Sequence, residues 1–315
     1  MRIGLDLGGT KVYGVRLDAG KVVAEAKRKT PPTGTPDDVV DVLAGVVDDL
    51  GGLTDVSGVG IGCPGAVDPA TGVVRGAANV GPLAGRDAVP LAAMVRARVG
   101  DAVDVRIGND VSVAVAGELA LGAGRDERDF IGIWVGTGVG GGVVLDGVVR
   151  TGAHGLAGEI GHTVVDLDGD RLCGCGRRGH LEAYAGRGSM EREARARHAG
   201  GVHTALVELA GDARMTSGVW ARAIEHDDRV ATRLLADCVE ALGCAVASAV
   251  TLLDVDLVVI GGGLAEKLGA AFTGRIADAA ARRLFPAIAP PRVVPGGLGD
   301  AAGAVGAALL VEAPA

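Results

Sequence analysis

The stretch RIGLDLGGTKVYGVRLD, residues 2–18, predicts a strand, a tight glycine-rich turn and a second strand. The same design recurs in FIGIWVGTGVGGGVVLDGVVR, residues 130–150. Each hairpin opens a segment in which further strands alternate with helices, so we expect an α/β protein built from two similar halves. No linker rich in serine or proline separates the halves, which favours packed domains with a cleft between them.

Other elements follow from the hydrophobic pattern and from the residues that begin and end helices. We expect helices at 35–50, 89–100, 111–124 and 301–310. We expect further strands at 56–62, 103–110 and 256–263, and a helix-rich stretch from about 183 to 253.

The composition limits the class of protein. A chain of 315 residues that is 48% hydrophobic has enough material for two cores. The net charge is −8 and no basic run is present, which argues against a nucleic-acid or membrane-surface partner. The first residues predict a strand rather than a signal peptide. Five cysteines are an odd, low count, so a reducing cytoplasm is favoured over a disulfide framework.

The glycine turns are candidate phosphate-binding segments. LGGT (7–10) and GTG (136–138) each offer successive backbone N–H groups and a threonine hydroxyl, and a third glycine run at 261–263 follows a predicted strand. GIGCPG (60–65) and GTGVGG (136–141) also fit the dinucleotide fingerprint, but no helix follows either of them directly. The alternative is that these segments are plain hairpin turns.

Candidate acid–base chemistry lies in IGNDV, residues 107–111, where a predicted strand ends and a helix begins. Asp110 is either the helix N-cap or a base that accepts a proton from a substrate hydroxyl. Asn109 can donate and accept hydrogen bonds with sugar hydroxyls. Asp6, before the first glycine turn, is placed to hold a Mg²⁺-bound water near phosphates.

A second polar group follows the repeated hairpin. Glu159 and His162 are three residues apart and share one face if this stretch is helical. Together with Glu182 they form a carboxylate–imidazole–carboxylate array of the kind that binds vicinal hydroxyls of a sugar. The alternative is a solvated, loop-rich surface.

The stretch LCGCGRRGH, residues 172–180, suggests a metal site. Cys173, Cys175 and His180, with His162 upstream, make a Cys₂His₂ set of the kind that binds structural zinc. Inert cysteines and a redox pair are the two alternatives, although a C-x-C spacing beside two histidines suits a thioredoxin-type site poorly.

These motifs together closely resemble the ROK family, which comprises bacterial sugar kinases, glucokinases among them, and some repressors. The resemblance spans nearly the whole chain in the family's order. It rests on DLGGTK (6–11), GIGCPGAVD (60–68), NDV (109–111), GTGVGGG (136–142), GLAGEIGH (155–162) and CGCGRRGHLEAYAG (173–186).

The resemblance implies an actin-like, ribonuclease-H-like two-domain sugar kinase fold. The small α/β domain would span 1–110 and be completed by a C-terminal helix at 300–315, and the large domain with the zinc loop would span 111–299. The implied activity is ATP-dependent transfer of phosphate to the 6-hydroxyl of a hexose, and glucose is the expected substrate. Asp110 would act as the base, and Mg²⁺ would bind together with the nucleotide.

The resemblance also assigns residues. The implied nucleotide segments are Asp6, Gly8, Gly9, Thr10, Lys11, Gly136, Thr137, Gly138, Gly261, Gly262 and Gly263. The implied sugar ligands are Asn79, Asn109, Glu159, His162 and Glu182. The stretch ANVGPLAGRD around Asn79 departs from the family's usual Asn-Leu-x-x-Trp pattern. The family usually has a third cysteine where this chain has His180, so the zinc set becomes Cys₂His₂.

Three rival functions remain. Other ROK kinases act on N-acetylglucosamine, N-acetylmannosamine, mannose or fructose, and their hydroxyl ligands are shared. Sugar-responsive repressors carry a helix-turn-helix before the first glycine turn, for which residues 1–7 leave no room. Relatives that use polyphosphate generally lack the cysteine motif. The family also suggests a homodimer or a dimer of dimers.

Overall fold

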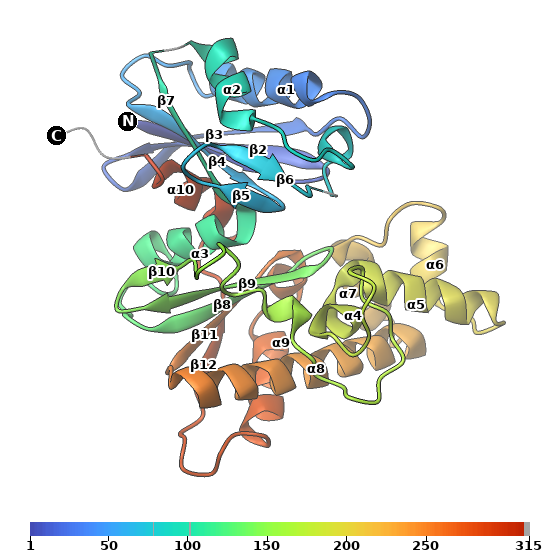
Figure 1. Cartoon of the computed structure of the whole chain (residues 1–315). Coiled ribbons are helices and arrows are strands. Elements are labelled where there is room, and N and C mark those ends of the chain that lie inside the picture. Colours follow the sequence, from blue (N-terminus) through green and yellow to red (C-terminus); the bar gives the residue numbers. More distant parts are fainter. Residues whose placement is uncertain (78, 101, 312–315) are drawn as a thin grey trace. The chain divides into compact units, whose positions relative to one another are not determined.

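The computed structural model describes residues 1–77, 79–100 and 102–311 (Figure 1). Two compact units divide the chain between them. The first unit contains Met1–Asp126, Val149–Ala157 and the chain from Asp300 onward, and the second contains Glu127–Val148 and Gly158–Gly299. The domain boundary expected after residue 110 stays a prediction. Of the C-terminal helix expected at 300–315, residues 312–315 lie outside the described residues.

The first unit is built on a five-stranded sheet with the order β3-β2-β1-β4-β7, beside a two-stranded sheet, β5-β6. Strands β1, β2 and β3 are antiparallel neighbours, whereas β4 and β7 run parallel to β1. The strands are β1 (Arg2–Leu7), β2 (Lys11–Asp18), β3 (Lys21–Lys29), β4 (Gly58–Cys63), β5 (Ala66–Asp68), β6 (Val73–Arg75) and β7 (Asp104–Asn109). The helices are α1 (Pro36–Asp49), η1 (Gly81–Leu83), α2 (Leu91–Val99), α3 (Asp110–Leu121), η3 (Gly299–Ala301) and α10 (Ala302–Ala308).

A second five-stranded sheet has the order β10-β9-β8-β11-β12, in which β8 and β9 are antiparallel and β11 and β12 run parallel to β8. Its strands are β8 (Phe130–Val135), β9 (Val139–Leu145), β10 (Val148–Arg150), β11 (Leu257–Gly261) and β12 (Arg292–Pro295). The helices of this half are η2 (Ile160–His162), α4 (Leu181–Ala185), α5 (Arg187–Ala199), α6 (Ala205–Ala210), α7 (Ser217–Glu225), α8 (Arg229–Leu253) and α9 (Gly263–Ala281).

The two sheets confirm the repeat expected from the sequence. Each sheet begins with an antiparallel hairpin around a glycine turn and adds two strands parallel to the first strand of that hairpin. The carboxyl ends of parallel strands meet at one edge of a sheet, which is where open α/β sheets bind ligands. This topology places Asp6 and Asn109 at one edge of the first sheet, and the turns after β8 and β11 at one edge of the second.

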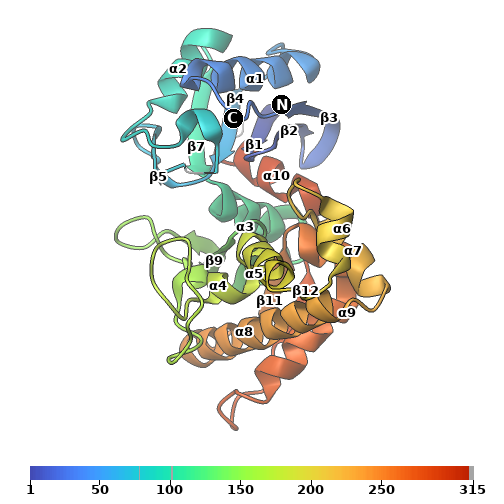
Figure 2. The same ribbon diagram turned by 90° about the vertical axis from the view of Figure 1, so that its right-hand side faces the viewer.

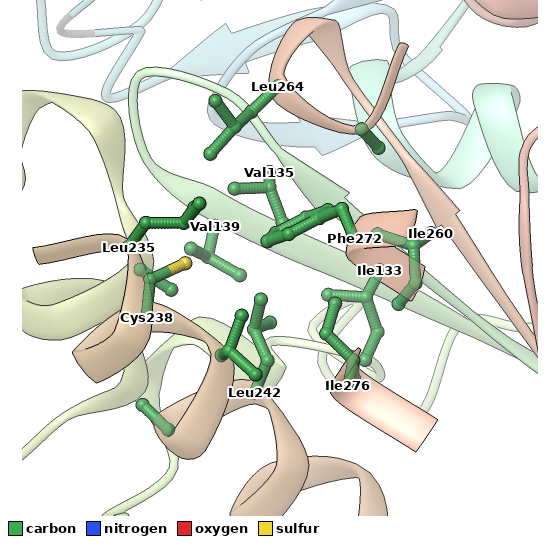
Figure 3. Close-up of a cluster of buried hydrophobic side chains, with 14 of the residues drawn as sticks. Ile133, Val135, Val139, Leu235, Cys238, Leu242, Ile260, Leu264, Phe272 and Ile276 are labelled. Carbon is green, nitrogen blue, oxygen red and sulfur yellow. The ribbon is translucent and has the colours of Figure 1, made fainter. Parts of the chain in front are cut away.

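A separate hydrophobic core stabilises each unit. In the first unit, aliphatic side chains of β1, β4 and β7 pack against α1 and α2. In the second unit, side chains from β8, β9 and β11 meet those of α8 and α9 (Figure 3). Phe272 and Leu242 lie at the centre of that contact, and Figure 2 shows α8 and α9 side by side.

Helix α8 is long and apolar enough to cross a membrane. Most of it is buried, however, because 61% of its most apolar window lies inside the second unit. Packing in this core therefore accounts for its composition. It is the one such helix among the described residues.

Helix α10, which the sequence predicts as small and apolar, packs very closely against β1, β4 and α3. A Cβ atom at Gly306 would lie 1.6 Å from the carbonyl oxygen of Val113, and one at Gly60 would lie 1.7 Å from that of Ala307. Both neighbours are backbone atoms, so they cannot move aside as a flexible side chain can. Glycine is required at these positions because the chains approach so closely.

We expect Gly306→Ala to destabilise the protein by about 1–3 kcal/mol, because the added methyl group overpacks the α3–α10 contact. Urea unfolding followed by circular dichroism measures the effect. Gly274→Ala is the matched control, since a Cβ there meets nothing within 4 Å and alanine favours the helix. Equal unfolding midpoints for Gly306→Ala and the wild type would show that this contact is looser than described.

Candidate active site

Two carboxylates lie at the carboxyl edge of the first sheet. Asp6 is near the end of β1, and Asp110 begins α3 directly after β7. Burial raises the pKa of Asp6 to about 7, the negative charge of Asp110 raises it further, and Lys11 opposes the shift. Helix α10 presses on Asp6, because a Cβ at Gly303 would lie 2.8 Å from its carboxyl carbon. This edge therefore concentrates negative charge that a cation can neutralise.

Asn109, and not Asp110, is the N-cap of α3. The Oδ1 atom of Asn109 accepts hydrogen bonds from the backbone N–H groups of Val111 (3.1 Å) and Ser112 (3.0 Å). Its Nδ2 donates to the carbonyl of Gly65 at 3.2 Å. The capping role considered for Asp110 is thus taken by its neighbour, which leaves one N–H of the Asn109 amide for a ligand. Asp110 Oδ1 accepts the N–H of Val111 at 3.0 Å.

The first glycine turn connects β1 to β2 beside these carboxylates. The N–H of Gly8 donates to the carbonyl of Lys11 at 3.0 Å, and Thr30 Oγ1 donates to the carbonyl of Gly8 at 2.6 Å. The backbone of Asn79 lies against the turn, since a Cβ at Gly9 would be 2.2 Å from the Asn79 carbonyl oxygen. Asn79 is exposed, and this backbone contact brings it next to the turn that follows Asp6.

Lys11 is paired with a carboxylate from the C-terminal part of the chain. Its ammonium contacts Asp300, which also lies 3.6 Å from Lys27 Nζ. Burial opposes the shift, but the hydrogen bond and charge of Lys11 leave the pKa of Asp300 below its usual range. Asp300 therefore holds the lysine of the glycine turn in place.

The second glycine turn rests on the start of α5. The carbonyls of Gly136 and Thr137 accept the backbone N–H groups of Arg187 (3.0 Å) and Gly188 (2.9 Å). The Gly136 N–H bonds to the carbonyl of Gly138 at 2.9 Å. The 136–138 turn is therefore held by backbone hydrogen bonds from α5 and by one hydrogen bond within the turn.

Glu182 connects this turn to the cysteine loop. Its Oε2 accepts the N–H of Val139 at 3.0 Å and fills the space where a side chain at Gly138 would lie. Its Oε1 accepts a hydrogen bond from the Cys173 thiol at 3.4 Å. The Glu182 carboxylate therefore contacts both the second glycine turn and the cysteine loop.

The glycine run after β11 lies at the same edge of the second sheet. Gly262 has φ of 88°, and a Cβ there would be 2.6 Å from the carbonyl oxygen of Val135. Only glycine suits both this backbone conformation and this close approach. The structure therefore brings together the 136–138 turn and the 261–263 run, as the sequence predicts.

The four expected metal ligands form one cluster. The ligand atoms of His162, Cys173, Cys175 and His180 all lie within 4.8 Å of one another. Cys173 Sγ is 3.8 Å from His162 Nδ1, and Cys175 Sγ is 3.3 Å from His180 Nδ1. A tetrahedral zinc site with ligand bonds of about 2.0–2.3 Å requires separations of roughly 3.3–3.8 Å between its ligands. The donor set and its spacing fit zinc.

The other nitrogen of His162 points away from this cluster. Its Nε2 lies 3.9 Å from Glu159 Oε2, and both side chains are exposed. The local element is a short 3₁₀ helix, Ile160–His162, which Glu159 directly precedes. The two groups nevertheless lie close enough to contact the same small ligand.

The sequence matches the model of the ROK family over residues 2–313. The chain belongs to the ROK family. A glucokinase of Thermotoga maritima is 32% identical over 98% of this chain and 96% of its own length. An N-acetyl-D-glucosamine kinase of Escherichia fergusonii is 34% identical over 98% of this chain and 99% of its own.

A solved structure gives the same assignment. The ROK family glucokinase of Streptomyces griseus, in complex with glucose and AMPPNP, has a TM-score of 0.82 and 31% identity, covering 98% of both chains. This chain therefore has the actin-like two-domain fold of the ROK sugar kinases, which confirms the fold class expected from the sequence.

The sequence analysis did not predict two charged residues that lie beside the glycine turns, Asp300 and Arg187. Asp300 pairs with Lys11 although 289 positions separate them. Arg187 contacts the 136–138 turn through its backbone and lies beside Gly263 through its side chain. Neither contact leaves a local pattern in the sequence.

The raised pKa of Asp6 predicts a pH-dependent stability. Between the ordinary carboxyl pKa of 3.8 and about 7, the unfolded chain has lost this proton while the folded chain keeps it, so stability falls as pH rises. We expect Asp6→Asn to be more stable than the wild type at pH 8, and expect the difference to shrink toward pH 4. Urea midpoints across this range, measured without divalent cations, give the slope.

Asp18→Asn, an exposed substitution on β2, is the control for the pH series and should leave the wild-type slope unchanged. If Asp6→Asn and the wild type show parallel stability curves from pH 4 to pH 8, the shifted pKa of Asp6 is wrong.

Proposed function

We propose that this chain is an ATP-dependent hexose kinase that phosphorylates the 6-hydroxyl of glucose. The observation that carries the proposal is Asp110 at the carboxyl edge of the first sheet, beside Asp6 and the glycine turn at residues 8–10. A carboxylate base next to an anion-binding turn is the arrangement that phosphoryl transfer to a hydroxyl requires. The ROK relatives named as glucokinases support the same activity.

In the proposed reaction the Asp110 carboxylate accepts the proton of the sugar 6-hydroxyl. The sugar oxygen then forms a bond to the γ-phosphorus of ATP as the bond from that phosphorus to the β-γ bridging oxygen breaks. The products are the hexose 6-phosphate and ADP, and the proton leaves from Asp110. Asp110 thus orients the hydroxyl and increases its nucleophilicity.

The nucleotide is proposed to bind both glycine turns and the 261–263 run. Lys11 and Thr10 of the first glycine turn and Thr137 of the second are the proposed side-chain contacts of its phosphate oxygens. Magnesium, when bound, neutralises phosphate charge. The carboxylate oxygens of Asp6 fit this hard cation, directly or through water. Binding of a cation there would also relieve the repulsion between Asp6 and Asp110.

The sugar is proposed to bind through five polar side chains. Their amides and carboxylates can pair with several hydroxyl groups, and they are Asn79, Asn109, Glu159, His162 and Glu182. A structural zinc would be held by His162, Cys173, Cys175 and His180. Because the metal would take Nδ1 of His162, its role is to aim Nε2 at a sugar hydroxyl.

A panel of sugars with ATP tests the specificity. We expect the highest kcat/KM for glucose, with lower values for mannose, fructose, N-acetylglucosamine and N-acetylmannosamine. The N-acetyl sugars are the serious alternatives, since a kinase named for one of them is 34% identical to this chain. A higher kcat/KM for either N-acetyl sugar would assign this chain to that class of ROK kinase instead.

The same assay tests the phosphoryl donor, with polyphosphate replacing ATP as the comparison. Use of ATP as donor supports a cytoplasmic location. Assembly as a homodimer or a dimer of dimers is proposed from the family resemblance, and light scattering measures it.

A further inference from the structure

Arg187 lies where the two glycine segments of the second unit meet. It is the first residue of α5, and its backbone N–H donates to the carbonyl of Gly136 at 3.0 Å. Its Nη1 donates to Ser217 Oγ at 2.7 Å, and Ser217 is buried at the start of α7. A Cβ at Gly263 would lie 2.9 Å from that hydroxyl and 3.8 Å from Arg187 Nη1. The absence of a side chain at Gly263 thus keeps the space beside the guanidinium open.

The charge of Arg187 is not balanced within the described part of the chain. No carboxylate there forms an ion pair with it, although it is half-buried. Other arginines of this unit do have acidic partners, among them Arg171 with Asp237 and Arg283 with Glu240. Burying a guanidinium without an anion is costly, so binding of an anion beside it is favourable.

Burial and the neighbouring Arg214 both favour an added anion beside Arg187. Burial lowers the pKa of Arg187, and the positive charge of Arg214 lowers it further. Glu191, one turn along α5, acts in the opposite direction. Its carboxylate, however, is already bound by Arg195 at 2.9 Å and by the N–H of Met215 at 3.0 Å.

The helix terminus itself does not supply this anion site. The first N–H groups of α5 are used by the carbonyls of Gly136 and Thr137, so they are not available to a ligand. The side chain of Arg187 is therefore the donor, and its planar fork of N–H groups suits phosphate oxygens.

We propose that Arg187 binds the phosphate chain of the nucleotide, as a ligand additional to the glycine segments. The inference rests on the proposed function, because it takes the 136–138 turn and the 261–263 run as the nucleotide site. Arg187 recognises phosphate and not the nucleoside. Its loss therefore affects binding of nucleotides in proportion to their charge and leaves adenosine binding unchanged.

Calorimetric titration of the full-length protein without sugar tests this proposal. AMPPNP, ADP and adenosine are each titrated into the wild type, Arg187→Gln and Arg187→Lys. Glutamine can still donate a hydrogen bond to Ser217 but carries no charge. We expect Arg187→Gln to weaken AMPPNP binding by about 10- to 100-fold, because a charge-assisted hydrogen bond is lost. Lysine should retain part of the affinity.

Arg192→Gln is the matched control, since Arg192 is exposed on the same helix and donates a hydrogen bond to Ser189. It should bind all three ligands as the wild type does. The proposal is overturned if AMPPNP affinity of Arg187→Gln stays within about twofold of the wild type, or if adenosine affinity falls equally, which indicates a structural role. A wild type that binds no adenine nucleotide would instead contradict the proposed function, and this inference with it.

Discussion

Replacing Asp110 by asparagine is expected to lower kcat by about 10²- to 10⁴-fold, the usual contribution of a general base. Asparagine has nearly the shape of aspartate and can still accept the N–H of Val111, so α3 should begin as before. Glucose affinity should therefore stay within a few-fold of the wild type. A coupled assay gives kcat, and equilibrium titration gives the Kd for glucose.

Asp104→Asn is the control for this substitution. Asp104 begins the same strand, β7, at the end opposite to Asn109, and it pairs with Arg106. Its loss should leave kcat unchanged. Near-wild-type turnover in Asp110→Asn would contradict the assignment of the base, and loss of glucose binding together with turnover would give Asp110 a binding role.

Removing the metal is expected to weaken glucose binding by about 10- to 100-fold, the usual effect of disturbing the groups that orient a ligand. Metal analysis of the purified protein should find about one zinc per chain. Without zinc, nothing fixes His162 Nδ1, and Nε2 is no longer aimed at the sugar. Titration of glucose into the loaded and the chelated protein measures the effect, and circular dichroism shows whether the chelated protein stays folded.

The ligand role of His180 can be tested separately. His180→Cys restores the family's usual ligand and should keep the metal, whereas His180→Ala should lose it. His198→Ala, an exposed histidine on α5 outside the cluster, should retain both zinc and glucose affinity. A metal-free wild type with full affinity for glucose would refute the zinc site.

Local patterns in the sequence predicted the framework well. The hairpin around LGGT and its counterpart around GTG are specified by residues within one turn and two strands, so they could be inferred without any tertiary information. The cluster of four candidate metal ligands was predicted for a similar reason. Three of them lie within eight residues, and His162 is the one that had to be placed across a longer loop.

Other details depended on contacts that no local pattern contains. Asn109 and Asp110 are both good caps, and the choice between them depends on the residue at which α3 begins. The stretch around Glu159 and His162, for which a helix was one possibility, forms a short 3₁₀ helix at Ile160–His162. Asp300 and Lys11 meet because the C-terminal segment with α10 packs on β1. Arg187 lies beside Gly263 because its side chain is hydrogen-bonded to Ser217 at the start of α7.

The most direct test of the account is the identity of the product formed from glucose and ATP. Phosphorus and proton NMR of the reaction mixture should show glucose 6-phosphate and ADP in equal amounts, formed by the wild type and nearly absent with Asp110→Asn. Phosphate on another hydroxyl would contradict the proposed position of transfer. Hydrolysis of ATP without sugar phosphate, or no reaction with any hexose tested, would contradict the claim that this chain is a hexose kinase.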